Sequence, residues 1–252
     1  MLFRVDSDAC PVDYLGAMNE KILIIIPTYN ECENITPIAT AVLQRLPQAH
    51  ILFVDDGSPD GTGILADSLA EGDPRIQVIH RAGKLGLGTA YLEGFRFALA
   101  REYELIFEMD ADFSHNPDHL PSFLEAARGG ADLVLGSRYV QGGGTVNWGV
   151  GRKILSRGGS LYARTILGVH VRDLTGGFKC FHRRVLEAID LDTVSSEGYS
   201  FQVEMTYRTL RRGFSVSEVP ITFMDRRVGQ SKMSREIFLE AIWMVWKLRL
   251  GS

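Results

Sequence analysis

The chain has 252 residues, of which 45% are hydrophobic and 23% charged, a composition ordinary for a globular protein with a sizeable core. The formal net charge of −4 gives no basic surplus for nucleic acid, so no nucleic-acid partner is expected. The three cysteines, Cys10, Cys32 and Cys180, have no metal-like spacing and predict free thiols in a reducing compartment.

The first twenty residues carry acidic side chains and no apolar run of signal-peptide length, so residues 1–20 are predicted to form an N-terminal extension. No stretch approaches the roughly 20 uninterrupted apolar residues of a membrane span. We therefore expect a cytoplasmic protein that is at most attached to a membrane surface.

From Lys21 onward, apolar runs of strand length alternate with segments of helical period. We expect strands at 22–26, 51–54, 76–79, 104–109 and 133–135, and helices at 34–46, 64–69, 89–100 and 119–127. The first strand is a continuous apolar run, which is typical of a strand buried on both faces of a parallel sheet. The alternation predicts an α/β fold with a mostly parallel sheet flanked by helices. Residues 139–151 are expected to form a glycine-rich loop before a less regular second half.

Polar clusters follow four of the expected strands, at residues 27–31, 55–56, 110–112 and 137–138. In an open parallel sheet, ligands bind beyond the carboxyl ends of the strands, and these ends lie at one edge. The coincidence of the four clusters at that edge predicts a binding site there.

The segment FEMDADFSHNP, residues 107–117, places two acids directly after an apolar strand. Residues two apart in an extended segment face the same way, so Asp110 and Asp112 can converge on one cation. Carboxylate oxygens suit Mg²⁺ or Mn²⁺, which usually bind substrate phosphates as well. The alternative is a turn residue beside a helix cap, and the neighbouring clusters make it weaker. His115 is interpreted as an exposed loop residue rather than a further ligand.

The loop after the first strand distinguishes between classes of nucleotide-binding protein. A dinucleotide site needs G-x-G-x-x-G there, whereas this chain has PTYNE and lacks a G-x-x-x-x-G-K-[ST] motif. A nicotinamide oxidoreductase and a P-loop phosphotransferase are therefore disfavoured. Tyr29 offers a ring that stacks on a base, and Glu31 and Asp56 offer acceptors for base or ribose donors. Asp55 is interpreted as a residue that shapes the turn.

Positive charge gathers in the second half of the chain, at Arg138, Arg152, Lys153, Arg157, Arg226, Arg227 and Lys232. Most of these side chains are interpreted as a solvated face. The run FMDRRVGQSKM differs, because three cations around a glycine and a serine suit phosphate oxygens. Asp173 and Glu204 each remain open between a catalytic base and a structural ion pair.

Seven motifs, in this order, resemble those of the inverting family 2 glycosyltransferases: IIPTYNE, VDDGSPDGT, MDADFSHNP, GSRYVQGGG, RDLTGGFKCF, GYSFQVEM and DRRVGQSKM. Within that family, the chain resembles the polyprenol (dolichyl) phosphate mannose synthases. The resemblance covers residues 21–235 and implies a single GT-A domain, with the mostly parallel sheet and flanking helices expected above.

The resemblance also implies roles for individual residues. The implied donor-binding residues are Pro27, Tyr29, Glu31, Val54, Asp56, Asp110, Ala111, Asp112, Arg226 and Lys232. The implied ligands of the acceptor phosphate are Arg138, Arg152 and Ser156, and the implied catalytic residues are Asp110, Asp112 and Arg138. Asp110, Asp112 and Ser114 would hold the metal. Some members have glutamine where this chain has the shorter Ser114, so direct coordination and coordination through water both remain open.

The implied reaction transfers mannose from GDP-mannose to a polyprenyl (dolichyl-type) phosphate with inversion, using Mg²⁺ or Mn²⁺. A lipid phosphate is already ionised near neutral pH and needs cations to place it more than a base, which matches the supply of arginines here. The alternative is a family 2 enzyme that uses another nucleotide sugar, or a sugar hydroxyl with Asp173 or Glu204 as base. A nucleotidyltransferase and a non-catalytic nucleotide-sugar sensor are weaker alternatives.

Residues 236–252 are predicted to form a C-terminal amphipathic helix, with an apolar stripe at helical spacing and Trp243 beside it. Lys247 and Arg249 supply positive charge. Such a helix can lie in a bilayer interface, whereas packing on the core or on another subunit is the alternative. We expect peripheral attachment to the cytoplasmic face of a membrane, and a membrane-anchoring protein is a further expected partner.

Overall fold

The structure is a computed structural model that describes residues 20–224 and 235–251. Its strands are β1 (Ile22–Thr28), β2 (His50–Asp55), β3 (Ile76–His80), β4 (Leu105–Glu108), β5 (Leu133–Ser137), β6 (Gly144–Val146), β7 (Lys179–His182), β8 (Val216–Pro220) and β9 (Thr222–Met224). Its α-helices are α1 (Ile35–Arg45), α2 (Thr62–Gly72), α3 (Leu87–Ala100), α4 (Leu120–Arg128), α5 (Val150–Leu167), α6 (Arg183–Ala188), α7 (Gly198–Arg211) and α8 (Arg235–Leu250).

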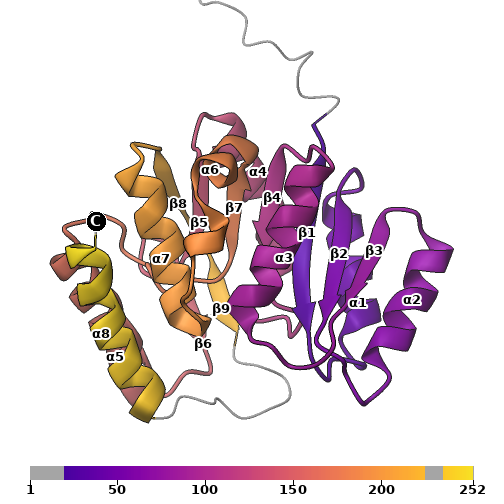
Figure 1. Cartoon of the computed structure of the whole chain (residues 1–252), viewed down its shortest axis with the longest axis horizontal. Coiled ribbons are helices and arrows are strands. Elements are labelled where there is room, and N and C mark those ends of the chain that lie inside the picture. Colours follow the sequence, from indigo (N-terminus) through magenta and orange to yellow (C-terminus); the bar gives the residue numbers. More distant parts are fainter. Residues whose placement is uncertain (1–19, 225–234, 252) are drawn as a thin grey trace, which may run out of the picture.

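A seven-stranded sheet forms the centre of the molecule, in the order β3-β2-β1-β4-β7-β5-β8 (Figure 1). Its pairings are parallel except for those of β7, which runs antiparallel to both of its neighbours, β4 and β5. The two short strands β6 and β9 pair in a second, parallel sheet. The α/β fold with a mostly parallel sheet is therefore confirmed.

Helices cover both faces of the large sheet (Figure 1). One hydrophobic core lies between the sheet and α3, α6 and α7, and side chains of α5 and α8 extend it. The other core lies between the sheet and α1, α2 and α4. This double burial explains why β1 is apolar throughout its first five residues, Ile22 to Ile26, each of which is at most 1% exposed.

The sequence predicted the first half of the fold better than the second. All five strands and four helices expected between residues 22 and 135 are present, with ends shifted by up to a few residues. The expected loop at 139–151 instead contains β6 and the first residues of α5. The antiparallel strand β7 and the long helix α5 were not expected.

One helix approaches the sheet closely because a glycine faces it. An ideal Cβ built on Gly94 of α3 would lie 2.7 Å from Cγ2 of Ile25 on β1. Any side chain at this position would push α3 away from the sheet. Gly94 therefore sets the distance between α3 and the strand that leads into the ligand-binding edge.

Helices α5 and α8 lie side by side at one end of the molecule (Figure 1). Both expose large apolar side chains: Ile154 and Leu161 of α5 are 67% and 60% exposed, and Trp243 and Leu250 of α8 are 70% and 77% exposed. Val245 of α8 is only 5% exposed and packs into the core. None of the helices in the described part of the chain is long and apolar enough to cross a membrane.

Candidate active site

The carboxyl ends of β1, β2, β4 and β5 lie at one edge of the sheet, because these four strands run in the same direction. The four polar clusters expected from the sequence therefore meet at this edge. The loops after β1, β2 and β4 form the half of the site expected to bind the donor nucleotide. The residues after β5 and the first turns of α5 form the half expected to bind the acceptor.

Hydrogen bonds join the loop after β1 to the loop after β2. The backbone N–H of Asn30 donates to Ser58 Oγ at 3.0 Å, and that of Glu31 donates to Thr62 Oγ1 at 2.9 Å. Asn30 has a φ of 61°, a left-handed conformation that asparagine tolerates better than most residues. The two loops thus form one preorganised wall of the donor half.

The two adjacent acids after β2 have different environments. Asp55 accepts hydrogen bonds from Thr28 Oγ1 at 3.1 Å and from the backbone N–H of Ser58 at 3.0 Å, so it shapes the turn as expected. Asp56 forms a buried ion pair in which Arg81 Nη1 donates to its Oδ1 at 2.5 Å. Arg81 was missed in the sequence, although it directly follows β3 at the ligand-binding edge.

Tyr29 and Glu31 lie near the surface of the donor half. The Nζ of Lys84, which belongs to the segment between β3 and α3, lies 4.2 Å from the centre of the Tyr29 ring. The Glu31 carboxylate accepts a hydrogen bond from Asn34 Nδ2 at 2.7 Å. Pro27 and Val54 are paired residues on β1 and β2, directly before these loops. The structure thus brings the expected donor residues of the first two loops together.

The acidic pair lies on a tight turn after β4. Asp112 accepts the backbone N–H of Ser114 at 3.0 Å, and Phe113 between them has a φ of 60°. A positive φ is unfavourable for a bulky residue, so the turn holds local backbone strain of the kind that is common at functional sites. Asp112 and Ser114 are 7% and 1% exposed, whereas Asp110 remains partly accessible.

The turn fits a divalent cation in one specific respect: Ser114 Oγ is buried and has no hydrogen-bond partner among the described residues. A buried hydroxyl without a partner is costly, and a metal ion or its bound water would satisfy it. In the described part of the chain, no three His, Cys, Asp or Glu side chains lie close enough together to hold a metal ion. Mg²⁺ sites with one or two carboxylates and substrate phosphates have no such third side chain.

His115 packs beneath the surface against the start of the turn, and its interpretation as an exposed loop residue is wrong. It is 2% exposed, and its ring stacks on Phe178 with the centroids 5.0 Å apart. Its Nδ1 accepts the backbone N–H of Asp110 at 3.0 Å, which helps to fix the start of the turn. Tyr91 Oη donates to Asp110 Oδ1 at 3.4 Å. The pKa of Tyr91 is raised, mainly by burial and secondly by the negative charge of Asp110.

A buried charged cluster lies under the same turn. Glu108 of β4 is paired in register with Lys179 of β7, and both side chains are fully buried. Burial raises the pKa of Glu108 to about 7 and lowers the pKa of Lys179 to about 8, and each charge opposes the other's shift. Lys179 Nζ donates to the backbone oxygen of Gln202 at 2.7 Å. Neither residue was singled out from the sequence.

The acceptor half is organised by a buried ion pair. Arg138, directly after β5, donates through Nε and Nη2 to the carboxylate of Asp173 at 2.7 and 2.6 Å. It also donates through Nη2 to Thr175 Oγ1 at 2.9 Å. The pKa of Arg138 is raised despite the opposing effect of burial, since Asp173 stabilises the charged form.

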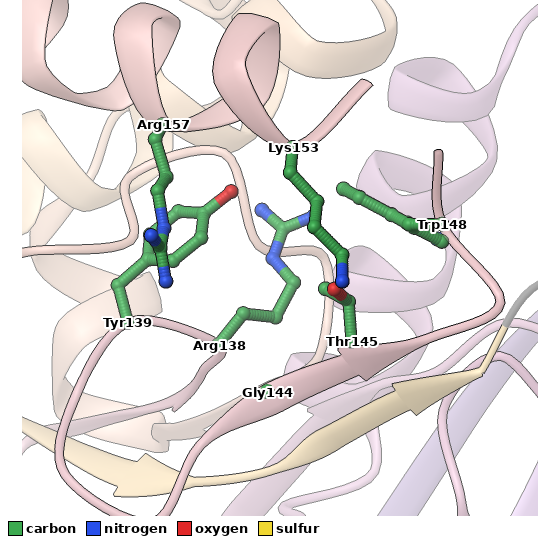
Figure 2. A pocket seen from close by; sticks show the side chains of 7 residues that line it. All are labelled: Arg138, Tyr139, Gly144, Thr145, Trp148, Lys153 and Arg157. Carbon is green, nitrogen blue, oxygen red and sulfur yellow. The ribbon is translucent and has the colours of Figure 1, made fainter. Parts of the chain in front are cut away.

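A pocket of about 240 Å³ opens beside this ion pair, between the loop after β5 and the first turns of α5. Figure 2 shows its lining: Arg138, Tyr139, Gly144, Thr145, Trp148, Lys153 and Arg157. Lys153 and Arg157 extend from α5 toward the loop that carries Arg138 and Tyr139 (Figure 2). The indole Nε1 of Trp148 is buried, and no residue in the described part of the chain is its hydrogen-bond partner.

The two other residues expected to bind the acceptor phosphate lie next to the pocket lining. The Arg152 guanidinium lies 4.1 Å from the centre of the Trp148 ring. The Tyr139 hydroxyl donates to Ser156 Oγ at 2.6 Å. Arg138, Arg152 and Ser156 are thus brought together around one pocket.

Both side chains considered as a base are held in ion pairs. Asp173 is fully buried and accepts from the side chain and the backbone N–H of Arg138. Glu204 of α7 is 3% exposed and accepts from Arg208 and from the hydroxyl and backbone N–H of Ser196. The expected donor-phosphate residues Arg226 and Lys232 lie outside the described residues.

A sequence model of glycosyl transferase family 2 matches residues 23–190, which is more than half of the chain and includes the loops of both half-sites. This chain belongs to glycosyltransferase family 2. The glycosyltransferase is 52% identical to a protein named polyprenol monophosphomannose synthase from Mycolicibacterium smegmatis, over 91% of this chain and 88% of that relative. It is 51% identical to a protein named undecaprenyl-phosphate mannosyltransferase from Micrococcus luteus, over 92% and 95%.

Solved structures support the GT-A fold of the glycosyltransferase. Glucosyl-3-phosphoglycerate synthase from Mycobacterium tuberculosis, solved with Mn²⁺, UDP and glucosyl-3-phosphoglycerate, aligns with a TM-score of 0.68. The alignment covers 100% of this chain and 87% of that chain at 19% identity. At this identity the similarity extends to the fold alone.

Proposed function

We propose that this glycosyltransferase transfers mannose from GDP-mannose to a polyprenyl phosphate, forming a β-linked polyprenyl phosphate mannose with inversion. One structural feature carries the proposal: a pocket lined by cations lies beside the end of β5, while Asp173 and Glu204, the two acids considered as bases, are held in ion pairs. The names of two relatives that are about half identical to this chain, a polyprenol monophosphomannose synthase and an undecaprenyl-phosphate mannosyltransferase, support the same acceptor.

The nature of the acceptor follows from the chemistry of the pocket. A hydroxyl acceptor must lose its proton during attack and needs a positioned base. A phosphate monoester is already anionic near neutral pH, so it needs only to be held with one oxygen in line with the anomeric carbon. Arginines bind phosphate oxygens through charged N–H donors. We assign this task to Arg152 and to the Arg138 donors that Asp173 and Thr175 leave over, with Ser156 beside them.

In the donor half, Tyr29, Glu31 and Asp56 would hold the nucleoside, and Asp110 and Asp112 would hold a divalent cation. Mg²⁺ or Mn²⁺ bound there would stabilise the negative charge that develops on the departing diphosphate. The chain's own contribution is orientation, since His115 and Tyr91 position Asp110 through the hydrogen bonds described above. Attack from the opposite side of the sugar inverts the anomeric carbon.

We further propose peripheral attachment to the cytoplasmic face of a membrane through α8 and the adjacent α5. A polyprenyl chain is confined to a bilayer, so the acceptor pocket must reach the membrane surface. The exposed tryptophans of α8, Trp243 and Trp246, together with Lys247 and Arg249, have the composition of an interfacial helix. α5 carries Arg152 and Ser156 as well as the exposed Ile154 and Leu161, which would place the phosphate site at the depth of the lipid headgroups.

Turnover with defined substrates tests the proposal. The full-length protein should transfer labelled mannose from GDP-mannose to a polyprenyl phosphate when Mg²⁺ or Mn²⁺ is present, and NMR of the product should identify the β-anomer. UDP-glucose as a second donor and polyprenol without phosphate as a second acceptor serve as controls. Faster transfer to the alcohol than to the phosphate would favour the hydroxyl-acceptor alternative and contradict the proposal.

A further inference from the structure

The acceptor pocket has three cationic side chains in its lining, but their charges are not equivalent. Arg138 is held by Asp173, whose carboxylate is fully buried and accepts two of its side-chain N–H groups. The positive charge of Arg138 is therefore largely compensated before any ligand binds. The net positive charge of the pocket lining comes from the other two cations, Lys153 and Arg157.

Lys153 and Arg157 lie four residues apart on α5, so they project from the same side of the helix on successive turns. Both extend toward Arg138 and Tyr139 (Figure 2). The Arg157 guanidinium lies 5.5 Å from the centre of the Tyr139 ring, which keeps it over the pocket. In the described part of the chain, no carboxylate forms an ion pair with Lys153 or Arg157.

We propose that Lys153 and Arg157 determine the charge state of the acceptor by binding the second negative charge of a phosphate monoester. This inference rests on the proposed lipid-phosphate acceptor and assigns two residues beyond Arg138, Arg152 and Ser156. Arg138, fixed by Asp173, supplies directional hydrogen bonds, whereas Lys153 and Arg157 supply uncompensated charge. The pocket then prefers the dianion of a phosphate monoester to its monoanion.

The shape of the site supports this division. Trp148 and Tyr139 flank the pocket, and Lys153 and Arg157 extend toward it from α5 while both residues stay exposed to solvent. Their exposure agrees with the interpretation of a solvated face, and the binding role is added to it.

The second proton of a phosphate monoester dissociates with a pKa of about 6. The fraction of the acceptor present as the dianion therefore increases as the pH rises from about 5.5 to 7.5. The acceptor KM of the unmodified protein should fall over this range. Without the two cations, the monoanion and dianion should bind more equally. The KM of a doubly substituted protein should therefore depend less on pH.

The test uses the full-length protein, GDP-mannose and a short-chain prenyl phosphate that dissolves in water without membranes or detergent. The variants are Lys153→Met, Arg157→Met and the double variant, with Lys153→Arg and Arg157→Lys as charge-conserving partners. Arg164→Met is the matched control, because Arg164 lies two turns further along α5 and does not line the pocket.

We expect the double variant to raise the KM for the prenyl phosphate by about tenfold or more at pH 7.5, as loss of charge-assisted contacts to one phosphate implies. Its pH dependence of KM should flatten, while the KM for GDP-mannose and the circular dichroism spectrum stay unchanged. The charge-conserving variants and Arg164→Met should remain within about twofold of the unmodified protein, less than the effect of a single lost contact.

Two results would overturn the inference alone, and a third would overturn it together with the proposed function. An unchanged acceptor KM with the soluble phosphate, together with a loss seen only on vesicles of anionic lipid, would assign Lys153 and Arg157 to general membrane attraction. A pH dependence that persists in the double variant would remove the charge-state role. If the unmodified protein transferred nothing to any prenyl phosphate but did use a sugar hydroxyl, the proposed function itself would fail and this inference with it.

Discussion

Arg138 and Asp173 form a paired contact in which two guanidinium nitrogens meet both carboxylate oxygens, at 2.7 and 2.6 Å, while the backbone N–H of Arg138 donates at 2.9 Å. The side chains are 5% and 0% exposed. This contact joins the loop after β5 to the segment before β7. Removing one member of a buried pair leaves the other charge uncompensated, which costs several kcal/mol.

Asp173→Asn separates a positioning role from a role as base. We expect the unfolding free energy to fall by roughly 3 kcal/mol and the acceptor KM to rise, because Arg138 loses its fixed orientation. The measurements are chemical denaturation and steady-state kinetics, with Asp192→Asn as control, since the exposed Asp192 forms a surface ion pair with Arg96. A large loss in kcat with unchanged stability and KM would instead support Asp173 as the base.

Asp112→Asn tests the metal site. Loss of one ligand charge should lower activity by about two orders of magnitude or more and leave the fold intact. Near-normal turnover of Asp112→Asn at saturating Mn²⁺ would contradict the assignment of Asp112 as a metal ligand. Ser114→Ala is the companion variant. The Ser114 hydroxyl has no partner in residues 20–224 and 235–251, so stability should hold, and a higher Mn²⁺ requirement would indicate a metal-facing role.

Glu108 gives the stability a defined pH dependence. Its pKa rises from 4.5 in the unfolded chain to about 7 in the fold, so the folded protein binds more protons between these values. Unfolding free energy should therefore decrease as the pH rises from 5 to 7.5, by up to about 3 kcal/mol. Glu108→Gln should remove this decrease in urea unfolding in metal-free buffer. An identical pH profile for both proteins would contradict the burial of a titrating carboxyl here.

Gly94→Ala should destabilise the fold, because the new methyl group would meet Ile25 at 2.7 Å. We expect a loss of about 1–3 kcal/mol from overpacking, measured by thermal unfolding. Gly158→Ala in α5 is the matched control, since no atom of the described residues lies within 4 Å of its ideal Cβ. That change should instead be neutral or stabilise the helix by up to about 1 kcal/mol. Equal effects at both sites would mean that α3 can shift without cost.

Replacing Trp243 and Trp246 by serine tests membrane attachment. Both side chains are substantially exposed, so the fold should survive, whereas flotation with liposomes of anionic lipid should fall several-fold. Nucleotide binding serves as the folding control. Arg211→Ser on the exposed end of α7 controls for a general loss of positive charge or surface area. Undiminished flotation of the tryptophan variant would exclude α8 as the main contact.

The sequence predicted those helices and strands whose own pattern of apolar and polar residues matches the secondary structure that they adopt in the fold. β1 and β4 are apolar runs that lead directly into polar turns, and both were expected with nearly their observed ends. β7 was missed because its first residue is the buried Lys179, which no strand pattern favours. α5 was missed because Gly158 and Gly159 interrupt its helical pattern.

For the site, the sequence identified residues but not their partners. Asp110, Asp112 and Arg138 could be placed at one edge from strand ends alone. Arg138 and Asp173 are 35 residues apart in the sequence. Their contact depends on the path of the chain between α5 and β7, which brings Asp173 back to the end of β5. The same segment leads into β7, whose register with β4 places Lys179 opposite Glu108. Long-range pairing of this kind has no local signal.

The position of β7 has a consequence for how the chain acquires its structure during synthesis. β4 and β5 precede β7 in the sequence, yet they are not neighbours in the sheet, because β7 lies between them. A nascent chain that has emerged only through β5 therefore has an unpaired edge on β4, whose apolar residues are prone to wrong association. We expect β1 to β4 to form an early folding unit, and β5 with β8 to join it only after residues 179–182 leave the ribosome. Synthesis rate and chaperone access over that interval would then govern the yield of native protein.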